Sequence, residues 1–292
     1  MKKLIVLFAA AVIALPLLCS CNPEDKPTKK VVMEPAPTAE DAVLFTFEEK
    51  PLYMMNGQKC EIVSIEFTED SRYILGLSPV IDGSVSATPD TKALKLGNVV
   101  NGKFTVSGGN YITHGEFQAQ MELRDQVAKI TGAVTGEFKG KKKRSESVTV
   151  EEVNANRTWV IDNTYIKITG GLNVEAAFKG CDFQEIAQFL KDNGAKIDPS
   201  KLAGYKVSEL ELTGSGTMNI VYSDKLSFYG SYTISGENFS YSLMIINNND
   251  IMGAVASGKL TFPADKKAEL VINTSISGYN GTIQFSMHQA AN

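Results

Sequence analysis

The sequence has few of the side chains on which metal binding and acid–base catalysis usually depend. It holds two histidines, four cysteines and one tryptophan among 292 residues. The two histidines, His114 and His288, lie far apart and lack neighbours of the metal-ligand type. Zinc sites need three or four such ligands in close register. We therefore expect no metal site and no bound cofactor.

Motifs of the common catalytic classes are also missing. The chain has no G-x-S-x-G elbow, no phosphate-binding loop and no H-E-x-x-H pair. Its adjacent acidic pairs fall in a linker, at a strand end or in turns, where solvated charge is the simplest interpretation: Glu24-Asp25, Glu48-Glu49, Glu69-Asp70 and Glu151-Glu152. We expect no enzyme, although the sequence leaves open two carboxylates that face each other across a cleft.

The charge balance excludes a general nucleic-acid surface. The chain has 29 basic and 33 acidic residues and a net charge of −4, so it lacks the positive field that attracts phosphate backbones. The basic run Lys141–Arg144 is flanked by Gly140 and Ser145. We interpret it as an exposed turn or linker.

The N-terminus has the layout of a secretory signal. Lys2 and Lys3 precede an apolar run over residues 4–18, which is shorter than the roughly 20 residues that cross a bilayer. The run ends in Leu18-Cys19-Ser20-Cys21, which resembles a bacterial lipobox. That resemblance implies cleavage before Cys21 and a diacylglycerol thioether on its thiol, so that the lipid bilayer is a partner. An uncleaved anchor helix and an ordinary secretory signal remain alternatives.

Residues 21–40 form a proline-rich tether after the signal peptide at 1–20. Their composition predicts an extended chain with little that could pack. The stretch Asn22–Asp25 resembles the surface-export signal of Bacteroidetes lipoproteins, with a solvated charge pair as the alternative. We therefore expect an outer-membrane lipoprotein of the cell envelope, exposed at the cell surface or facing the periplasm.

From Val43 onward the apolar residues mostly alternate with polar ones, which indicates β-strands. Residues 63–67 and 73–77 alternate on either side of Glu69-Asp70-Ser71 and predict a hairpin. One helix is expected, with Asp182 as N-cap, Glu185 as its capping-box partner and an apolar stripe over residues 183–190. The mature chain keeps Cys60 and Cys181, which we expect as two buried thiols more readily than as a disulfide.

An internal repeat divides the chain in two. Residues 102–111 match residues 230–239 at five of ten positions, and each copy follows a similar hairpin, at 64–75 and at 209–220. Two β-hairpins can share Thr, Ser and Gly by chance, but duplication is the interpretation we prefer. It predicts a first β-barrel domain at 41–155 and a second at 156–292.

The start of the second domain resembles the lipocalin (calycin) family. Arg157-Thr158-Trp159 stands where that family has a G-x-W strand, with Asn156-Arg157 in place of its glycine. The whole chain resembles the lipocalin-like lipoproteins of uncharacterised function from Bacteroidetes. This resemblance implies an all-β fold of two tandem antiparallel barrels, with one short helix in the second and Trp159 plugging a barrel end.

A small closed barrel can hold one ligand, so we expect a binding protein for a small apolar molecule or a glycan. Alternation places Tyr222, Phe228 and Tyr232 on one strand face and Tyr229 on the other. We take Tyr229, Tyr232 and Tyr241 as candidate ligand-binding residues. The alternative is a structural or protein-interaction lipoprotein whose barrels are filled by side chains; a cavity of a few hundred Å³ inside a barrel would favour the first.

Overall fold

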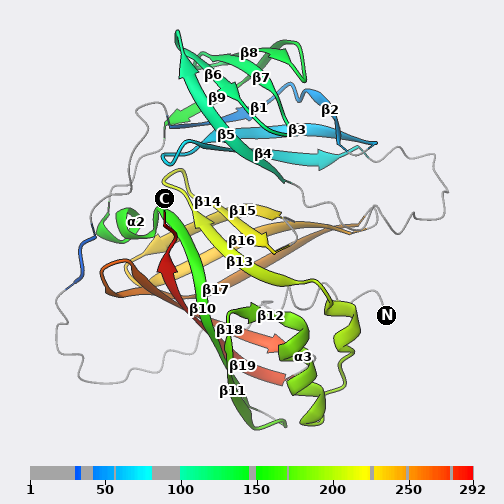
Figure 1. Ribbon diagram of the computed structural model, residues 1–292, viewed down its shortest axis with the longest axis vertical. Helices are drawn as coiled ribbons and strands as arrows, with labels where there is room; N and C mark the ends of the chain where they lie inside the picture. Colours follow the sequence, from blue (N-terminus) through cyan, green and yellow to red (C-terminus); the bar gives the residue numbers. More distant parts are fainter. Residues whose placement is uncertain are drawn as a thin grey trace.

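The protein consists of two β-barrels in tandem, one above the other in the view of the computed structural model in Figure 1. The structure describes residues 30–33, 42–55, 57–80, 99–144, 149–169, 171–223, 227–247, 250–276 and 279–291. About two thirds of the chain (64%) is in strands, and each barrel closes with eight antiparallel strands. The predicted all-β fold with two tandem barrels is confirmed.

Barrel one closes through β1, which pairs antiparallel with both β3 and β9. The strand β2 lies outside the closed ring and pairs with β3. The strands of this barrel are β1 (Val43–Phe47), β2 (Leu52–Met55), β3 (Gln58–Phe67), β4 (Arg72–Pro79), β5 (Val99–Ser107), β6 (Asn110–Thr113), β7 (Ala119–Leu123), β8 (Val127–Gly132) and β9 (Gly136–Arg144).

Barrel two closes in the same way, because β10 pairs with both β13 and β19. Between β10 and β13 the chain adds two short strands and a helix. The elements are α2 (Val150–Ala155), β10 (Arg157–Thr169), β11 (Val174–Lys179), β12 (Cys181–Asp182), α3 (Phe183–Asp192), the 3₁₀ turn η2 (Pro199–Leu202), β13 (Lys206–Leu212), β14 (Thr217–Tyr222), β15 (Ser227–Ser235), β16 (Asn238–Asn247), β17 (Asp250–Ala264), β18 (Lys267–Ile276) and β19 (Tyr279–Gln289).

The two copies of the sequence repeat occupy equivalent places in the two barrels. Residues 102–111 run from β5 through a turn into β6, and residues 230–239 run from β15 through a turn into β16. In the order of strands around each ring, β5 and β6 correspond to β15 and β16. This placement supports the duplication that the sequence predicts.

Apolar side chains fill the interiors of both barrels. In barrel one the rings of Phe67 and Tyr111 stack with their centroids 4.2 Å apart inside a single core cluster. Barrel two has one cluster around Trp159 and another beneath α3. The indole Nε1 of Trp159 donates to the carbonyl oxygen of Ala155 at 3.1 Å, so this side chain ties α2 to the barrel core.

The helix of barrel two begins where the sequence predicts. The carboxylate of Asp182 accepts from the backbone N–H groups of Gln184 and Glu185, which caps α3. The helix α2 was not predicted, although Thr149 and Glu152 form a capping box that starts it. The domain boundary predicted at 155/156 falls between α2 and β10.

The basic run Lys141–Arg144 is not a turn or linker as we expected. It forms the end of β9 and pairs with β1, with Phe45 opposite Lys142. The lysine side chains at 141 and 143 point outward and are exposed. The error arose because alternating outward charges and a flanking Gly140 concealed a strand that contributes few apolar side chains.

Part of the tether also differs from the expectation of a chain with little that could pack. Residues 30–33 lie against barrel two, and Met33 is buried in the same cluster as Trp159. Cys21 and the rest of the tether lie outside the described residues.

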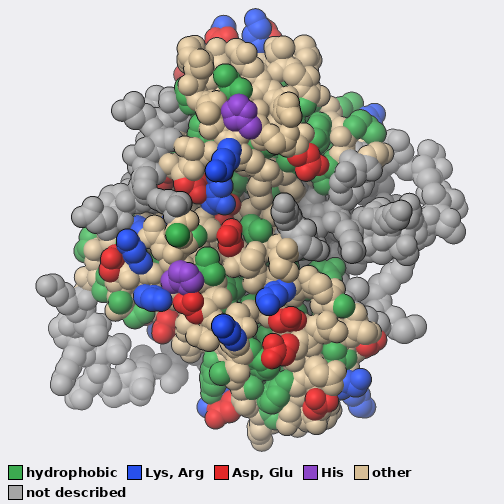
Figure 2. All heavy atoms as spheres, in the orientation of Figure 1, with side chains coloured by type: hydrophobic (Ala, Val, Ile, Leu, Met, Phe, Trp, Pro, Cys, Tyr) green, Lys and Arg blue, Asp and Glu red, His purple; other side chains and the backbone are tan. Residues whose placement is uncertain are grey.

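The cysteines, the helices and the surface charge complete the description of the fold. Cys60 and Cys181 lie in separate core clusters, one in each barrel, so no disulfide joins them. Within the described residues, no helix combines the length and the apolar character needed to cross a bilayer. Acidic and basic side chains are interspersed over the face shown in Figure 2 and do not form a patch of one sign.

Candidate functional site between the two barrels

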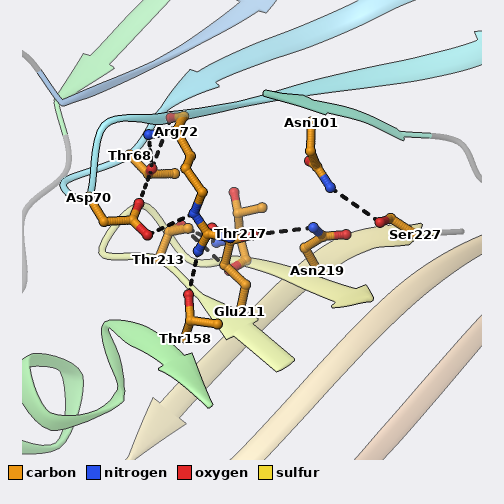
Figure 3. Close-up of polar contacts among 10 residues, drawn as sticks. All are labelled: Thr68, Asp70, Arg72, Asn101, Thr158, Glu211, Thr213, Thr217, Asn219 and Ser227. Carbon is orange, nitrogen blue, oxygen red and sulfur yellow. Dashed lines mark hydrogen bonds and ion pairs between the residues drawn. The ribbon is translucent and has the colours of Figure 1, made fainter. Parts of the chain in front are cut away.

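The two barrels meet through equivalent hairpins, β3–β4 of barrel one and β13–β14 of barrel two (Figure 3). The register is the same in both: Glu66 lies opposite Ile74, and Glu211 lies opposite Asn219. Each hairpin also has a register shift at the same place, between residues 62 and 64 and between residues 207 and 209.

The turns of the two hairpins share their hydrogen bonds. The backbone N–H of Thr68 donates to the backbone carbonyl oxygen of Arg72 at 2.8 Å. The backbone N–H of Thr213 donates to the backbone carbonyl oxygen of Thr217 at 3.0 Å. The threonine hydroxyls accept in turn from the N–H groups of Arg72 and Thr217. Glu-Phe-Thr at 66–68 and Glu-Leu-Thr at 211–213 therefore build one local structure twice.

The contacts across the interface follow an approximate two-fold symmetry. The carboxylate of Glu211 pairs with Arg72 at 2.8 Å, and the carboxyl of Glu66 accepts from the hydroxyl of Ser215. Each glutamate thus points at the turn of the other hairpin. Further out, Asn101 on β5 donates to Ser227 on β15 at 3.2 Å, again between equivalent strands.

Arg72 is the central cation of this interface. Its guanidinium contacts Glu211, Asp70 at 2.7 Å and the hydroxyl of Thr158. Burial alone would lower the pKa of Arg72, but the carboxylates of Glu211 and Asp70 outweigh burial and raise that pKa above its ordinary value. Arg72 therefore stays charged and holds β4 of barrel one to β10 and β13 of barrel two.

Glu211 is buried, with 4% of its surface exposed. Burial raises the pKa of Glu211 to about 7, although the charge of Arg72 acts in the opposite direction. The second carboxylate oxygen accepts from the side-chain amide of Asn219 at 3.2 Å. This carboxyl is therefore held by one cation and one neutral donor.

Glu66 occupies the equivalent position but has different partners. Only 1% of its surface is exposed, and among the described residues its Oε2 atom has no hydrogen-bond partner. Burial raises the pKa of Glu66, and the hydroxyls of Ser215, Thr217 and Thr213 offset this only in part. Where Glu211 faces Arg72, Glu66 faces hydroxyl groups.

A cavity of about 520 Å³ opens beside this interface and is lined by both barrels. The polar and charged part of its lining includes Arg72, Lys103, Arg157, Glu69, Glu209 and Glu211. The Arg157 guanidinium is held by the side-chain oxygen of Gln289 at 2.7 Å and the carbonyl oxygen of Val153 at 3.2 Å. The cavity therefore offers hydrogen-bond donors and acceptors of both charges.

Two of the three tyrosines that the sequence suggests, Tyr232 and Tyr241, do not line this cavity. Tyr232 and Tyr241 are buried in the core of barrel two, and the Tyr232 hydroxyl donates to the backbone oxygen of Thr213 at 2.8 Å. The side chain of Tyr229 and the whole of Cys21 lie outside the described residues. Ligand contact at these tyrosines and lipidation of Cys21 stay predictions.

Sequence reasoning missed the residues that the interface brings together. The sequence predicts Glu69 and Asp70 as solvated turn charges, but Asp70 pairs with Arg72, and Glu69 accepts from the side-chain amide of Asn156. The signal that could have found them is the repeated Glu-x-Thr before each turn. A glutamate kept at the same strand position in both halves marks a shared environment. Among the described residues, no three His, Cys, Asp or Glu side chains gather as a metal site.

Comparison with known proteins gives no family. No family model and no curated protein matches the chain. Among solved structures, it is similar to transferrin-binding protein B of Haemophilus parasuis, a vaccine antigen, with 10% identity and a TM-score of 0.26 over 81% of this chain and 55% of that one. The chain thus spans about half the length of that protein.

Two further structures cover their own chains more fully. A DUF3598-family protein with unknown function from Nostoc punctiforme is 8% identical, with a TM-score of 0.23 over 85% of this chain and 95% of that one. A surface lipoprotein is 11% identical, with a TM-score of 0.25 over 88% of this chain and 100% of that one. Scores this low carry no argument about fold or function, so the fold described above rests on strand pairing alone.

Proposed function

We propose that this protein is a cell-envelope lipoprotein, anchored through acylated Cys21, that binds a small polar ligand between its two barrels. The observation that carries the binding role is the interbarrel cavity. Its volume of about 520 Å³ lies within the range of roughly 300–1,000 Å³ that ligand sites occupy. We propose that the protein binds this ligand and does not act on it as an enzyme.

The chemistry of the lining favours a glycan over an apolar molecule. Sugar hydroxyls both donate and accept hydrogen bonds, so they can use carboxylates such as Glu209 and cations such as Lys103 together. An apolar ligand would strip water from these charges without replacing their hydrogen bonds. It would also find the barrel interiors occupied by the core clusters.

The ligand proposal is tested by a thermal-shift screen with neutral and uronic-acid oligosaccharides and with fatty acids. The protein used starts at position 21 with Cys21→Ser, so that it is soluble. We expect an oligosaccharide to raise the melting temperature, and Glu209→Gln or Lys103→Ala to remove the shift. Lys129→Ala, on the outer face of β8, is the matched control that keeps it. A shift by fatty acids that Glu209→Gln and Lys103→Ala leave unchanged would contradict the proposal.

The anchor has its own test, independent of any ligand. Metabolic labelling with palmitate should mark the wild type and not the Cys21→Ser variant, and that variant should leave the membrane fraction. Equal labelling of both proteins would refute the anchor. Digestion of intact cells with an added protease tests surface exposure, and membrane fractionation tests placement in the outer membrane.

A second candidate function is protein interaction, and one observation favours it. Leu52 and Met54 on β2 are more than half exposed, and β2 forms the end of its sheet. Apolar side chains on an edge strand suit pairing with another chain. A photo-crosslinker at position 54 should then give one discrete adduct in intact cells, whereas a crosslinker at position 129 should give none.

A further inference from the structure

The described part of the tether is bound to barrel two by a specific set of contacts. The side-chain amide of Asn154 accepts from the backbone N–H of Met33 at 2.9 Å and donates to the backbone oxygen of Val31 at 2.8 Å. The Lys30 ammonium pairs with Glu151. One asparagine thus satisfies both a donor and an acceptor of an extended segment, as a neighbouring strand would.

The fold holds Asn154 in place for this contact. Helix α2 is fixed at its start by the capping box of Thr149 and Glu152, and at its end by Trp159, which donates to the Ala155 carbonyl. The buried Met33 packs in the cluster that contains Ala155 and Trp159. We call the surface formed by residues 30–33 and α2 the tether corner; Figure 1 shows it beside the junction of the two barrels.

The chain between Cys21 and the first described residue, Lys30, is short. Between Cys21 and Lys30 lie residues 22–29, eight in all. A fully extended chain spans at most about 3.6 Å per residue, so this segment reaches about 29 Å. The strand β10 alone has 13 residues and, at about 3.3 Å per residue, is about 43 Å long. A segment of this length keeps the tether corner within about 29 Å of Cys21, which restricts the orientations that the molecule can take at the membrane.

We infer that the tether corner is a membrane-facing surface and that its partner is the lipid bilayer. This inference rests on the proposed lipid anchor at Cys21. The corner exposes two apolar side chains, Val32 at 69% and Val150 at 37%. Beside them the Lys30 side chain is 72% exposed, and its charge is balanced by Glu151. Exposed apolar side chains next to a paired charge suit the boundary between lipid headgroups and acyl chains.

The orientation also places the proposed ligand site. Asn156 and Arg157 line the interbarrel cavity and directly follow α2 in the chain. The cavity therefore lies close to the membrane surface, within reach of glycans that extend from lipid headgroups.

The test uses the full lipoprotein, purified in detergent and reconstituted into vesicles of phosphatidylethanolamine and phosphatidylglycerol. A photo-crosslinking amino acid is placed at position 32 or 150 on the tether corner, and at position 129 on β8 or 188 on α3 as controls. We expect lipid adducts at 32 and 150 about tenfold above those at 129 and 188, because only the tether corner lies against the lipid while the two controls face away from it. Equal yields at the four positions in membrane-bound protein would overturn the inference.

Two variants distinguish a failure of the proposed orientation from a failure of the proposed lipid anchor. An insertion of twelve Gly/Ser residues after residue 25 lengthens the tether and should lower the adduct yield at position 150 to that at 129. Asn154→Ala should do the same by releasing the tether, with Trp159 fluorescence as the check on folding. Protein that does not stay with the vesicles refutes the lipid anchor. Protein that stays, yet keeps its yield at 150 in both variants, refutes the orientation.

Discussion

The two barrels share their strand order and the hairpin through which they meet, but they differ in which groups face the buried glutamate of that hairpin. Glu66 of barrel one and Glu211 of barrel two occupy the same register position, and both are buried. Glu211 faces a cation, Arg72, whereas Glu66 faces the hydroxyls of Ser215 and its neighbours. The position equivalent to Arg72 is Thr217.

This difference teaches how a duplicated domain can hold its copy. A two-fold contact between two copies of barrel two, each with a threonine at the position of Arg72, would bring two carboxyls into one interface without a cation. Burying two charges without partners costs several kcal/mol, so a symmetric contact of this kind is unstable. One arginine serves Glu211, whereas burial raises the pKa of Glu66 although its hydroxyl partners lower it, so the two carboxyls differ in environment while the backbone keeps its symmetry.

The strongest way to break the comparison is to remove Arg72, the cation that Glu211 faces. Arg72→Met leaves Glu211 buried without an opposite charge, and we expect it to lower the free energy of unfolding by about 3–5 kcal/mol. Urea denaturation of the soluble Cys21→Ser protein measures this loss. Adding Glu211→Gln to Arg72→Met should restore much of the stability, because the uncompensated charge is then absent.

Arg124→Met is the matched control. Arg124 pairs with Glu122 on the outer surface of barrel one, where both side chains are exposed. We expect stability close to that of the wild type, since solvated ion pairs contribute little. If Arg72→Met behaved like Arg124→Met, the interface would not depend on this ion pair.

The alternation of apolar residues was sufficient to predict the β3–β4 hairpin and its turn, and the pairing of Phe67 with Tyr73 confirms it. Alternation fails at the details that tertiary contacts decide. We expected Val63 on the apolar face, but the register shift between Ile62 and Ser64 buries Ile62 and leaves Val63 half-buried. A bulge of this kind changes the facing of side chains without a signature in the local pattern.

The candidate site could not be predicted for a related reason. The alternating pattern places Glu66 on the outer face of its strand, which is correct, but it does not say that a second barrel covers that face. The Glu66–Ser215 contact joins residues 149 positions apart. The repeat contained the necessary signal in Glu66 and Glu211, because equivalent outward glutamates beside equivalent turns are expected where two copies meet.

The pH dependence of stability gives a second, smaller way to probe the comparison. Burial raises the pKa of Glu66, and it raises the pKa of Glu211 from 4.5 to about 7. Between pH 4.5 and about 7 the folded state therefore binds more protons than the unfolded state, so the free energy of unfolding falls as the pH rises. The contribution of these groups is fully present below pH 4.5 and is lost as the pH rises through their folded pKa values, about 7 for Glu211.

Glu66→Gln should remove the share of Glu66, since an amide stays neutral at every pH. We expect the variant to be more stable than the wild type at pH 8, and the loss of unfolding free energy between pH 5 and 8 to be smaller than in the wild type. Glu122→Gln, on the exposed face of β7, is the control that keeps the wild-type profile. A profile for Glu66→Gln that parallels the wild type would mean that Glu66 titrates as a solvated carboxyl.

The smallest expected effect concerns the side chains behind the two turns. Tyr232 in barrel two and Phe104 in barrel one are equivalent in the repeat, and only the tyrosine can donate to the turn, where it bonds to the Thr213 oxygen. Tyr232→Phe gives barrel two the barrel-one residue and should lower the free energy of unfolding by about 1 kcal/mol, the usual net value of one hydrogen bond.

Phe104→Tyr makes the reciprocal change in barrel one. The equivalent backbone oxygen is that of Thr68, so the two-fold relation predicts near-neutral stability for this variant. A loss of about 1–3 kcal/mol, the cost of overpacking, would show that the symmetry of the backbone does not extend to the space behind the turn.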